Sequence, residues 1–144
     1  MEATHRLIVH GLMKIGNKYL VIKRTPIKRF KPNSYPLFWD IPGGMVEKGE
    51  LPKAALLRET KEEVNLDIIV KNIIHEDSNL DLNKNIVFTR LVYLCEVIED
   101  NISNIKLQED EHSEYRLINT LEDINEEKLV PYMYNVFKNL NKSK

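Results

Sequence analysis

Several features that would mark a secreted, membrane or nucleic-acid-binding protein are missing from this chain. It has one cysteine, Cys95, so no disulfide forms within it, and a reducing cytoplasm is the expected compartment. No apolar run approaches the roughly 20 residues of a spanning helix, and charges interrupt the N-terminal segment, which lacks a signal-peptide core. Lys and Arg number 21 against 22 Asp and Glu, so no net field attracts nucleic acid or an anionic membrane.

The composition and the hydrophobic pattern favour one α/β domain over residues 1–144. Hydrophobic residues make up 42% and charged residues 30% of the chain, which is ordinary for a soluble protein with one core. Gly16-Asn17 separates two segments rich in β-branched residues and predicts a hairpin. The three prolines of 25–38 predict a loop. Strands are expected at 6–15, 18–24, 39–41, 67–76, 85–98 and 111–118.

Two helices are expected near the C-terminus. Thr120 with Asp123 resembles a capping box that opens a short helix at 121–124. Pro131 marks the start of a longer helix over 131–140, because proline suits the first helical turn. Its apolar residues recur at i, i+3, i+4 and i+7 and predict a face that packs on the sheet: Met133, Val136, Phe137 and Leu140.

A third helix, Pro52–Val64, is expected to have an acidic side and a packing side. At about 100° per residue, Glu59, Glu62 and Glu63 fall with small Ala55 within an arc of about 100°. Three carboxylates so placed repel one another unless they share counter-charge, and Mg²⁺ is bound by oxygen ligands of this kind. A solvated acidic surface is the alternative. The packing side would be formed by Lys53, Leu56, Leu57, Thr60 and Val64.

The residues in front of this helix favour the metal-binding interpretation. Gly43 and Gly44 follow a proline and give a loop whose backbone can approach a ligand closely. From Gly44 the charged residues recur at fixed intervals over 23 residues: Glu50, Arg58-Glu59 and Glu62-Glu63, followed by Asn65 and Leu66. This set resembles the Nudix box, Gly-x5-Glu-x7-Arg-Glu-U-x-Glu-Glu-x-Gly-U, where U is a bulky aliphatic residue.

The chain departs from the box at two positions. Thr60 replaces the aliphatic residue on the packing side, where its hydroxyl can bond the carbonyl one turn earlier. Asn65 replaces the final glycine and tolerates the left-handed cap conformation that glycine serves. Neither change touches a charged position, so the resemblance still implies a working enzyme.

The resemblance to the Nudix hydrolase family implies both a fold and an activity. The fold would be the Nudix-type α/β/α sandwich, a mixed sheet between helices. The activity would be metal-dependent hydrolysis of a nucleoside diphosphate linked to another moiety, with Mg²⁺ as cofactor and Mn²⁺ able to substitute. Carried over, Glu59, Glu62 and Glu63 would be metal ligands together with the Gly43 carbonyl. Arg58 would orient the acidic residues, Glu50 would fix the junction between loop and helix, and Gly44 would supply backbone freedom.

Further site residues are expected outside the box. Family members often add a carboxylate from a later loop as base or ligand, and among Glu109, Asp110, Glu111 and Glu114 we favour Glu111. A basic stretch before the box suits a polyphosphate, or is a solvated loop: Arg24, Lys28, Arg29 and Lys31.

Other conspicuous residues are assigned to the core or to no site. Trp39 and Cys95 are expected to be buried packing residues. The four histidines, His5, His10, His75 and His112, are dispersed without metal-ligand spacing, which argues against a zinc site.

The substrate is the least determined feature. The family's ADP-ribose hydrolases often carry a proline after the box, and none occurs here between Pro52 and Pro131. The family's dinucleoside polyphosphate enzymes often carry a tyrosine in a similar place after the box. The first tyrosine after the box in this chain is Tyr93, which lies rather far along. The favoured substrate is therefore a nucleoside triphosphate, oxidised ones included, which would be cleaved to monophosphate and pyrophosphate. Nucleotide sugars and dinucleotides are the alternative substrates. A catalytically silent nucleotide sensor, an unrelated acidic binding module and a metal-dependent isomerase are the rivals, and the oligomeric state stays open.

Overall fold

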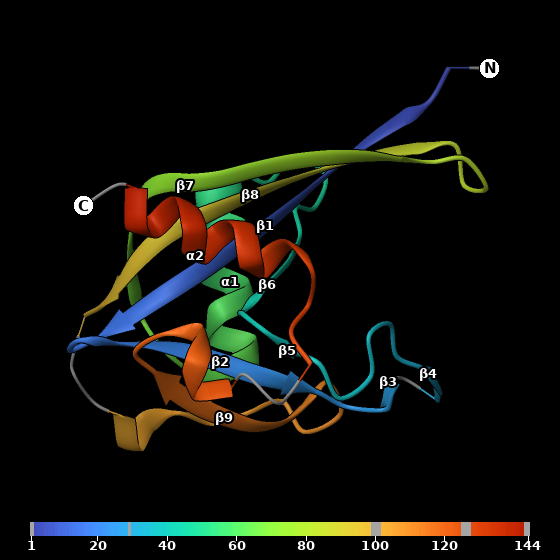
Figure 1. Cartoon of the computed structure of the whole chain (residues 1–144). Coiled ribbons are helices and arrows are strands. Elements are labelled where there is room, and N and C mark those ends of the chain that lie inside the picture. The colour runs from blue at the N-terminus through green and yellow to red at the C-terminus, as the bar shows by residue number, and fades with distance from the viewer. Residues whose placement is uncertain (1, 29, 99–101, 125–127, 143–144) are drawn as a thin grey trace.

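A computed structural model describes residues 2–28, 30–98, 102–124 and 128–142. Strands β1 to β6 precede the first long helix, α1, and the second long helix, α2, ends the described chain, as Figure 1 shows. Two short 3-10 helices lie at Ile102–Asn104 and Leu121–Ile124. The other elements, in chain order, are β1 (Thr4–Ile15), β2 (Lys18–Arg24), β3 (Ile27–Lys28), β4 (Lys31–Pro32), β5 (Trp39–Asp40), β6 (Gly43–Met45), α1 (Pro52–Val64), β7 (Ile68–Asp81), β8 (Ile86–Val97), β9 (His112–Ile118) and α2 (Tyr132–Lys142).

Seven of these strands form a mixed sheet with the order β5-β2-β1-β8-β7, and β3 and β4 form a separate two-stranded sheet. β1 and β8 run parallel along nearly their whole length, from Thr4 beside Ile86 to Lys14 beside Glu96. The other neighbours in this order are antiparallel, and β6 and β9 join the sheet antiparallel to β1 and β2. β1 therefore lies beside both β8 and the short strand β6, which leads into α1.

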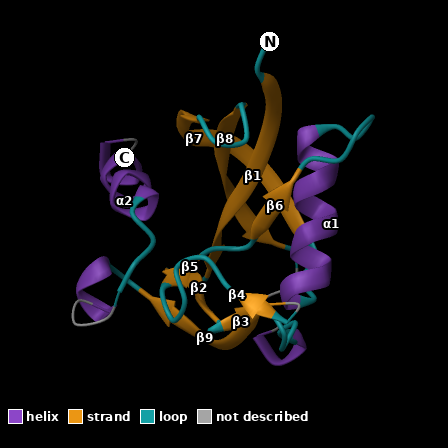
Figure 2. Ribbon diagram, turned by 90° about the vertical axis from the view of Figure 1, so that its right-hand side faces the viewer, coloured by secondary structure: helices purple, strands orange, loops and turns teal. Residues whose placement is uncertain are grey.

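The two long helices cover opposite faces of the sheet, as Figure 2 shows. Because successive strand residues point to opposite faces, β1 divides its side chains between two cores. Leu12 packs in the core under α2, whereas Val9 and Met13 pack in the core under α1. Among the described residues, neither helix is long and apolar enough to cross a membrane.

Most expected local elements are confirmed. Gly16 has φ of 61° between β1 and β2, as the predicted hairpin requires. Asn65 ends α1 in the left-handed conformation, with φ of 61°. The Asp123 carboxylate accepts the Thr120 N–H at 3.3 Å, and the Thr120 hydroxyl accepts the Glu122 N–H at 3.3 Å, so both side chains cap this turn. The four apolar residues of the C-terminal helix are buried: Met133, Val136, Phe137 and Leu140.

Three expectations about local structure were wrong. The segment after Pro42, expected as a loop, forms β6 and pairs with β1. The expected loop at 25–38 contains a small hairpin, because Ile27–Lys28 pairs with Lys31–Pro32. β7 continues past the predicted end at Glu76 to Asp81, because β8 provides a partner along this whole length. The partner of β6 is the distant strand β1, so no local pattern in the sequence indicates that pairing.

The buried side of α1 differs from the predicted packing side. Leu56, Thr60 and Val64 are buried as expected, but Leu57 is 46% exposed and Lys53 is exposed. Ala55 and Glu63 are buried instead. The helix is thus turned so that part of its acidic side faces the sheet, where β6 packs against it. Contrary to expectation, the Thr60 hydroxyl has no hydrogen-bond partner among the described residues.

Trp39 and Cys95 are packing residues, as predicted. Trp39 is fully buried at the edge strand β5 and belongs to the core under α2. Cys95 is fully buried in the opposite core. Burial raises the pKa of the Cys95 thiol to about 12, so the thiolate does not form near neutral pH.

Candidate metal centre and active site

Two glycines allow the backbone of β6 to approach the acidic side of α1. A Cβ atom added at Gly43 would lie 2.1 Å from the carbonyl oxygen of Val9 in β1. One added at Gly44 would lie 2.6 Å from the carboxyl carbon of Glu59. Without these side chains, the Gly43 N–H donates a 2.8 Å hydrogen bond to Glu63 Oε2. This contact fixes the box's last glutamate against the strand that precedes the helix.

Arg58 joins the carboxylates on the exposed part of the box. Its Nε and Nη2 donate to the two oxygens of Glu50 at 2.9 and 3.0 Å, a bidentate pair. Its Nη1 lies 2.9 Å from Glu59 Oε1 and 3.4 Å from Glu62 Oε2. The hydrogen bonds from Arg58, with one from the Glu47 N–H, lower the pKa of Glu50 to about 2. Arg58 thus holds the loop end and two box glutamates in one arrangement.

This pairing predicts an acid-dependent loss of stability. The folded pKa of Glu50 is lowered from 4.5 to about 2, so its ionised form stabilises the fold above pH 4.5, and this contribution is lost as pH falls toward 2. We expect Glu50→Gln to melt at a lower temperature than the wild type at pH 7, and the difference to shrink below pH 4.5. Thermal unfolding monitored by circular dichroism between pH 7 and about pH 3 measures this.

A matched control is Asp67→Asn, which removes a 3.4 Å ion pair between the exposed side chains of Lys61 and Asp67. Exposed pairs contribute little, so we expect a small shift in melting temperature. A Glu50→Gln difference that stayed constant across the pH range would contradict the assigned role of Glu50.

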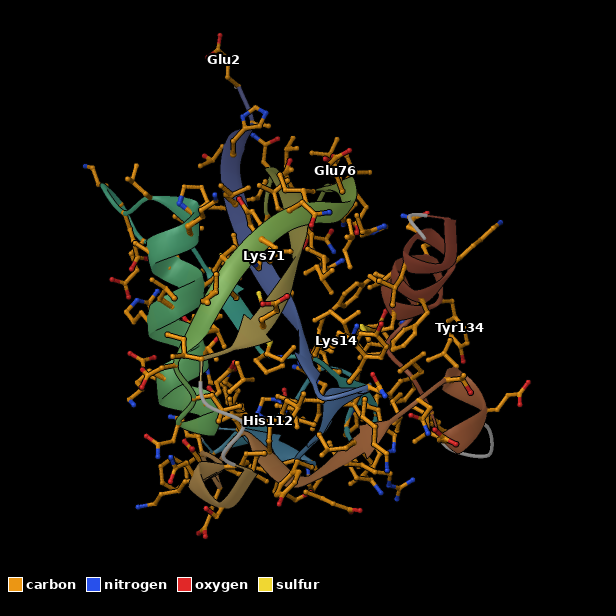
Figure 3. All side chains as sticks on the ribbon, turned by 90° about the vertical axis from the view of Figure 1, so that its left-hand side faces the viewer. Glu2, Lys14, Lys71, Glu76, His112 and Tyr134 are labelled. Carbon is orange, nitrogen blue, oxygen red and sulfur yellow. The ribbon has the colours of Figure 1, made fainter. Side chains whose placement is uncertain are left out.

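The loop after β8 is tied to the last turn of α1. The final carbonyls of a helix lack partners within the helix, and here two of them accept from the loop. Lys106 N–H donates to the Val64 carbonyl at 3.0 Å, and Gln108 N–H donates to the Glu63 carbonyl at 3.1 Å. The N–H groups of Glu111 and His112 both donate to the Gln108 carbonyl at 3.0 Å. The backbone therefore brings residues 111 and 112 to Glu63, and Figure 3 shows His112 near the C-terminal end of α1.

Glu63, Glu111 and His112 converge at this junction. One ligand atom from each lies within 4.8 Å of the others, and all three residues are buried. Burial raises the pKa of Glu63 well above its usual range, and the nearby Glu59 and Glu111 add to this effect. Burial also raises the pKa of Glu59 despite its bonds to Arg58. The cluster is therefore short of positive charge.

A cavity of about 260 Å³ opens beside the cluster and contains a second set of charged residues. Buried Asp40 pairs with Arg24 at 3.0 Å and accepts a hydrogen bond from the Tyr132 hydroxyl. Although burial opposes its ionisation, His10, Tyr132 and Arg24 hold the pKa of Asp40 below its usual value. The Arg90 guanidinium lies 4.0 Å from the centre of the Tyr132 ring. The cavity thus combines cations with an aromatic face beside the carboxylates.

The residues of the expected basic stretch lie in different places. Arg24 and Lys28 line the cavity. Arg24 is largely occupied by the protein, because it donates to Asp40, Asn33 and Ser34. Lys28 Nζ lies 2.9 Å from Glu111 Oε1. Lys31 is exposed on β4 and does not line the cavity. Arg29 lies outside the described residues.

Several cavity residues were missed by the sequence analysis. Asp40, Arg90 and Tyr132 come from β5, β8 and the start of α2, which meet only in the folded chain. The available signal for Asp40 and Arg90 was a charged residue within a mostly apolar segment. The histidines gave no signal because their spacing in the sequence is irregular, yet His10 and His112 both line the cavity.

Comparison with known protein sequences gives one family. A family model described as NUDIX domain matches residues 4–140. An ADP-ribose pyrophosphatase of Methanocaldococcus jannaschii is 34% identical over 90 residues, which cover 62% of this chain and 50% of that protein. An 8-oxo-dGTP diphosphatase of Proteus vulgaris is 52% identical over 61 residues, 42% of this chain and 51% of that protein. The chain spans about half the length of these curated relatives.

Solved structures show the same fold. A MutT protein from Methanosarcina mazei Go1 matches with a TM-score of 0.75 and 24% identity, covering 99% of this chain and 97% of that one. A NUDIX hydrolase from Nitrosomonas europaea matches with a TM-score of 0.76 and 15% identity, covering 98% and 91%. The α/β/α sandwich predicted from the sequence is confirmed.

Proposed function

The chain belongs to the Nudix family, and on that premise we propose that it hydrolyses a phosphoric anhydride bond in a nucleotide with the help of divalent metal ions. The observation that carries the proposal is the convergence of Glu63, Glu111 and His112 beside the cavity. All the charged positions of the box are present, and Arg58 holds three of its glutamates. A nucleotide sensor without activity would not need these charges to be kept together.

The residues present fit a divalent cation. Glu63 is a buried carboxylate whose pKa is raised by burial and by neighbouring carboxylates, so a bound cation would supply the missing positive charge. We propose Glu59, Glu62, Glu63 and the Gly43 carbonyl as ligands of Mg²⁺, with Mn²⁺ able to substitute. When bound, the metal withdraws charge from phosphate oxygens and lowers the pKa of a bound water.

The remaining site residues would position the reactants. Arg58 and Glu50 keep the box glutamates in place, which lowers the cost of bringing like charges together. Lys28 borders the cavity and, once released from Glu111, can pair with a phosphate. Glu111 is buried beside Glu63 and lines the cavity, so it is placed to act as general base or as a further metal ligand. Arg24 acts through Asn33, Ser34 and Asp40 by fixing the cavity wall.

We propose a nucleoside triphosphate, oxidised forms included, as substrate, cleaved to monophosphate and pyrophosphate. The 52% identity with an 8-oxo-dGTP diphosphatase and the lack of proline between Pro52 and Pro131 support this choice. The second candidate is ADP-ribose, supported by the 34% identity with an ADP-ribose pyrophosphatase.

A turnover screen tests both candidates. The protein is incubated with nucleoside triphosphates, 8-oxo-dGTP, ADP-ribose, nucleotide sugars and dinucleotides, with Mg²⁺, Mn²⁺ or a chelator. We expect pyrophosphate and monophosphate from a triphosphate, and no turnover with the chelator, because the proposed water activation depends on the metal. Products are separated by anion-exchange chromatography. Faster cleavage of ADP-ribose would favour the second candidate, and no cleavage of any compound would overturn the proposed activity.

A further inference from the structure

We propose that Glu63, Glu111 and His112 form a mixed nitrogen and oxygen site that takes a divalent first-row transition-metal ion, such as Mn²⁺, in preference to Mg²⁺. The proposal deepens the proposed function, on which it rests, because Glu63 is shared with the box. It adds His112, which lies outside the box, as a direct ligand through an imidazole nitrogen.

The geometry brings three ligand atoms together without a change of fold. One ligand atom from each of the three side chains lies within 4.8 Å of the others. Glu63 is 4%, Glu111 7% and His112 5% exposed, so the protein has already removed these groups from water. The Gln108 N–H donates to the Glu63 carbonyl, and the Gln108 carbonyl accepts from the N–H groups of residues 111 and 112, which holds the junction in place. The ligand side chains are therefore already ordered in the folded chain, and metal binding does not have to supply the free energy of ordering them.

His112 is the independent indication that the cluster is a site. Its Nδ1 is buried and has no hydrogen-bond partner within the described part of the chain. A buried polar atom without a partner costs free energy, so such atoms are rare in folded proteins. A metal ion beside the two carboxylates would give the imidazole the partner that it lacks.

Lys28 occupies the place of a cation in the metal-free protein. Its Nζ lies 2.9 Å from Glu111 Oε1, whereas its side chain is 37% exposed. The ammonium can therefore leave for solvent or for a substrate phosphate when a metal binds. It follows that Lys28 competes with the metal for Glu111, and that removing its charge strengthens metal binding.

The donor set determines which metal is preferred. Mg²⁺ favours oxygen ligands and keeps several waters, so a nitrogen ligand adds little to its binding affinity. Imidazole is a good ligand for first-row transition metals, whose affinity for such sites rises along the series from Mn²⁺. A site with two carboxylates and one imidazole therefore discriminates against Mg²⁺ more than a site made of oxygen alone.

The direct test is pulsed electron paramagnetic resonance of Mn²⁺ bound to the wild-type protein without nucleotide. Nitrogen bonded to Mn²⁺ modulates the spin echo, and labelling the histidines with ¹⁵N changes that modulation. We expect a directly coordinated histidine nitrogen that disappears in His112→Gln. An echo without nitrogen coupling in the wild type overturns the proposal, and this measurement does not require any variant to fold.

Binding affinities give a second test. We expect His112→Gln to weaken Mn²⁺ binding by about tenfold while changing Mg²⁺ binding by less than about threefold. Lys28→Met should strengthen Mn²⁺ binding. His5→Gln, at an exposed position, and His75→Gln, at a buried position outside the cluster, are the controls, and neither should change the nitrogen signal. Equal losses of Mn²⁺ and Mg²⁺ affinity in His112→Gln would overturn the proposal.

The two proposals fail differently. Nucleotide turnover without nitrogen coupling removes His112 from the metal and leaves the hydrolase proposal intact. Nitrogen coupling without turnover of any nucleotide keeps the metal site and overturns the hydrolase proposal.

Discussion

Replacing Glu63 with Gln is expected to lower nucleotide turnover by about a thousandfold or more and, at the same time, to raise the melting temperature of the metal-free protein. Turnover falls because the amide does not supply the negative charge that the cation needs. Stability rises because Glu63 is 4% exposed and lies near the carboxylates of Glu59 and Glu111. The amide oxygen can still accept the hydrogen bond from the Gly43 N–H.

The raised pKa of Glu63 determines how the stability of the metal-free protein changes with pH. Burial raises the folded pKa of Glu63 well above 4.5, so the stability contributed by its protonated form is present below pH 4.5 and is lost as pH rises through the raised pKa. We expect the metal-free wild type to lose stability over this range, and Glu63→Gln to lose less. Thermal unfolding in a chelator, repeated with Mn²⁺, measures both effects.

Glu62→Gln is the matched variant, because Glu62 is a box glutamate that is exposed. We expect it also to lower turnover by orders of magnitude, but without raising the melting temperature of the metal-free protein. If Glu63→Gln kept near-wild-type turnover, the assignment of Glu63 to the metal would be wrong. If it destabilised the metal-free protein, the account of the buried charge would be wrong.

Among substitutions that add one methyl group to the site, Gly43→Ala is expected to destabilise the fold most. The new Cβ would lie 2.1 Å from the Val9 carbonyl oxygen and 2.7 Å from the His10 Cα. Both are atoms of a central strand with a neighbour on each side, so β6 must move instead. We expect a loss of about 3 kcal/mol in the free energy of unfolding, together with loss of turnover. Urea denaturation and the nucleotide assay measure the two effects.

Two other glycines provide controls for this variant. Gly44→Ala would meet the Glu59 carboxyl group at 2.6 Å, the far end of a side chain, so we expect a smaller loss of stability but reduced turnover. Gly49→Ala has open space but a φ of 81°, so we expect about 1 kcal/mol from backbone strain and retained turnover. A Gly43→Ala protein as stable as Gly49→Ala would contradict the close approach of β6 to β1.

The features that could be predicted from sequence are those set by neighbours in the chain. Gly16 and Asn65 adopt the positive φ that their residue types favour, and Pro52 begins the helix. The helical repeat places glutamates at the spacing of the box on one side of the helix, so their common side could be predicted without a structure. The family resemblance, rather than the pattern of strands and helices, supplied the fold.

The features that could not be predicted depend on contacts between distant segments. The orientation of α1 depends on β6 packing against it, which buries Glu63 and leaves Leu57 exposed. Arg24 appeared to be a free cation, but it binds Asp40 from a strand 16 residues later. His112 reaches Glu63 because a loop caps the end of α1. None of these contacts leaves a periodic signal in the sequence.

The central claim is that the acidic side of α1 holds divalent cations against a nucleotide's phosphates. Crystals grown with Mn²⁺ and a non-hydrolysable nucleotide, measured at a wavelength where manganese scatters anomalously, test it most directly. The account predicts an anomalous peak in contact with Glu63 and with a phosphate oxygen. A nucleotide bound in the cavity with no anomalous peak beside Glu63 would contradict it.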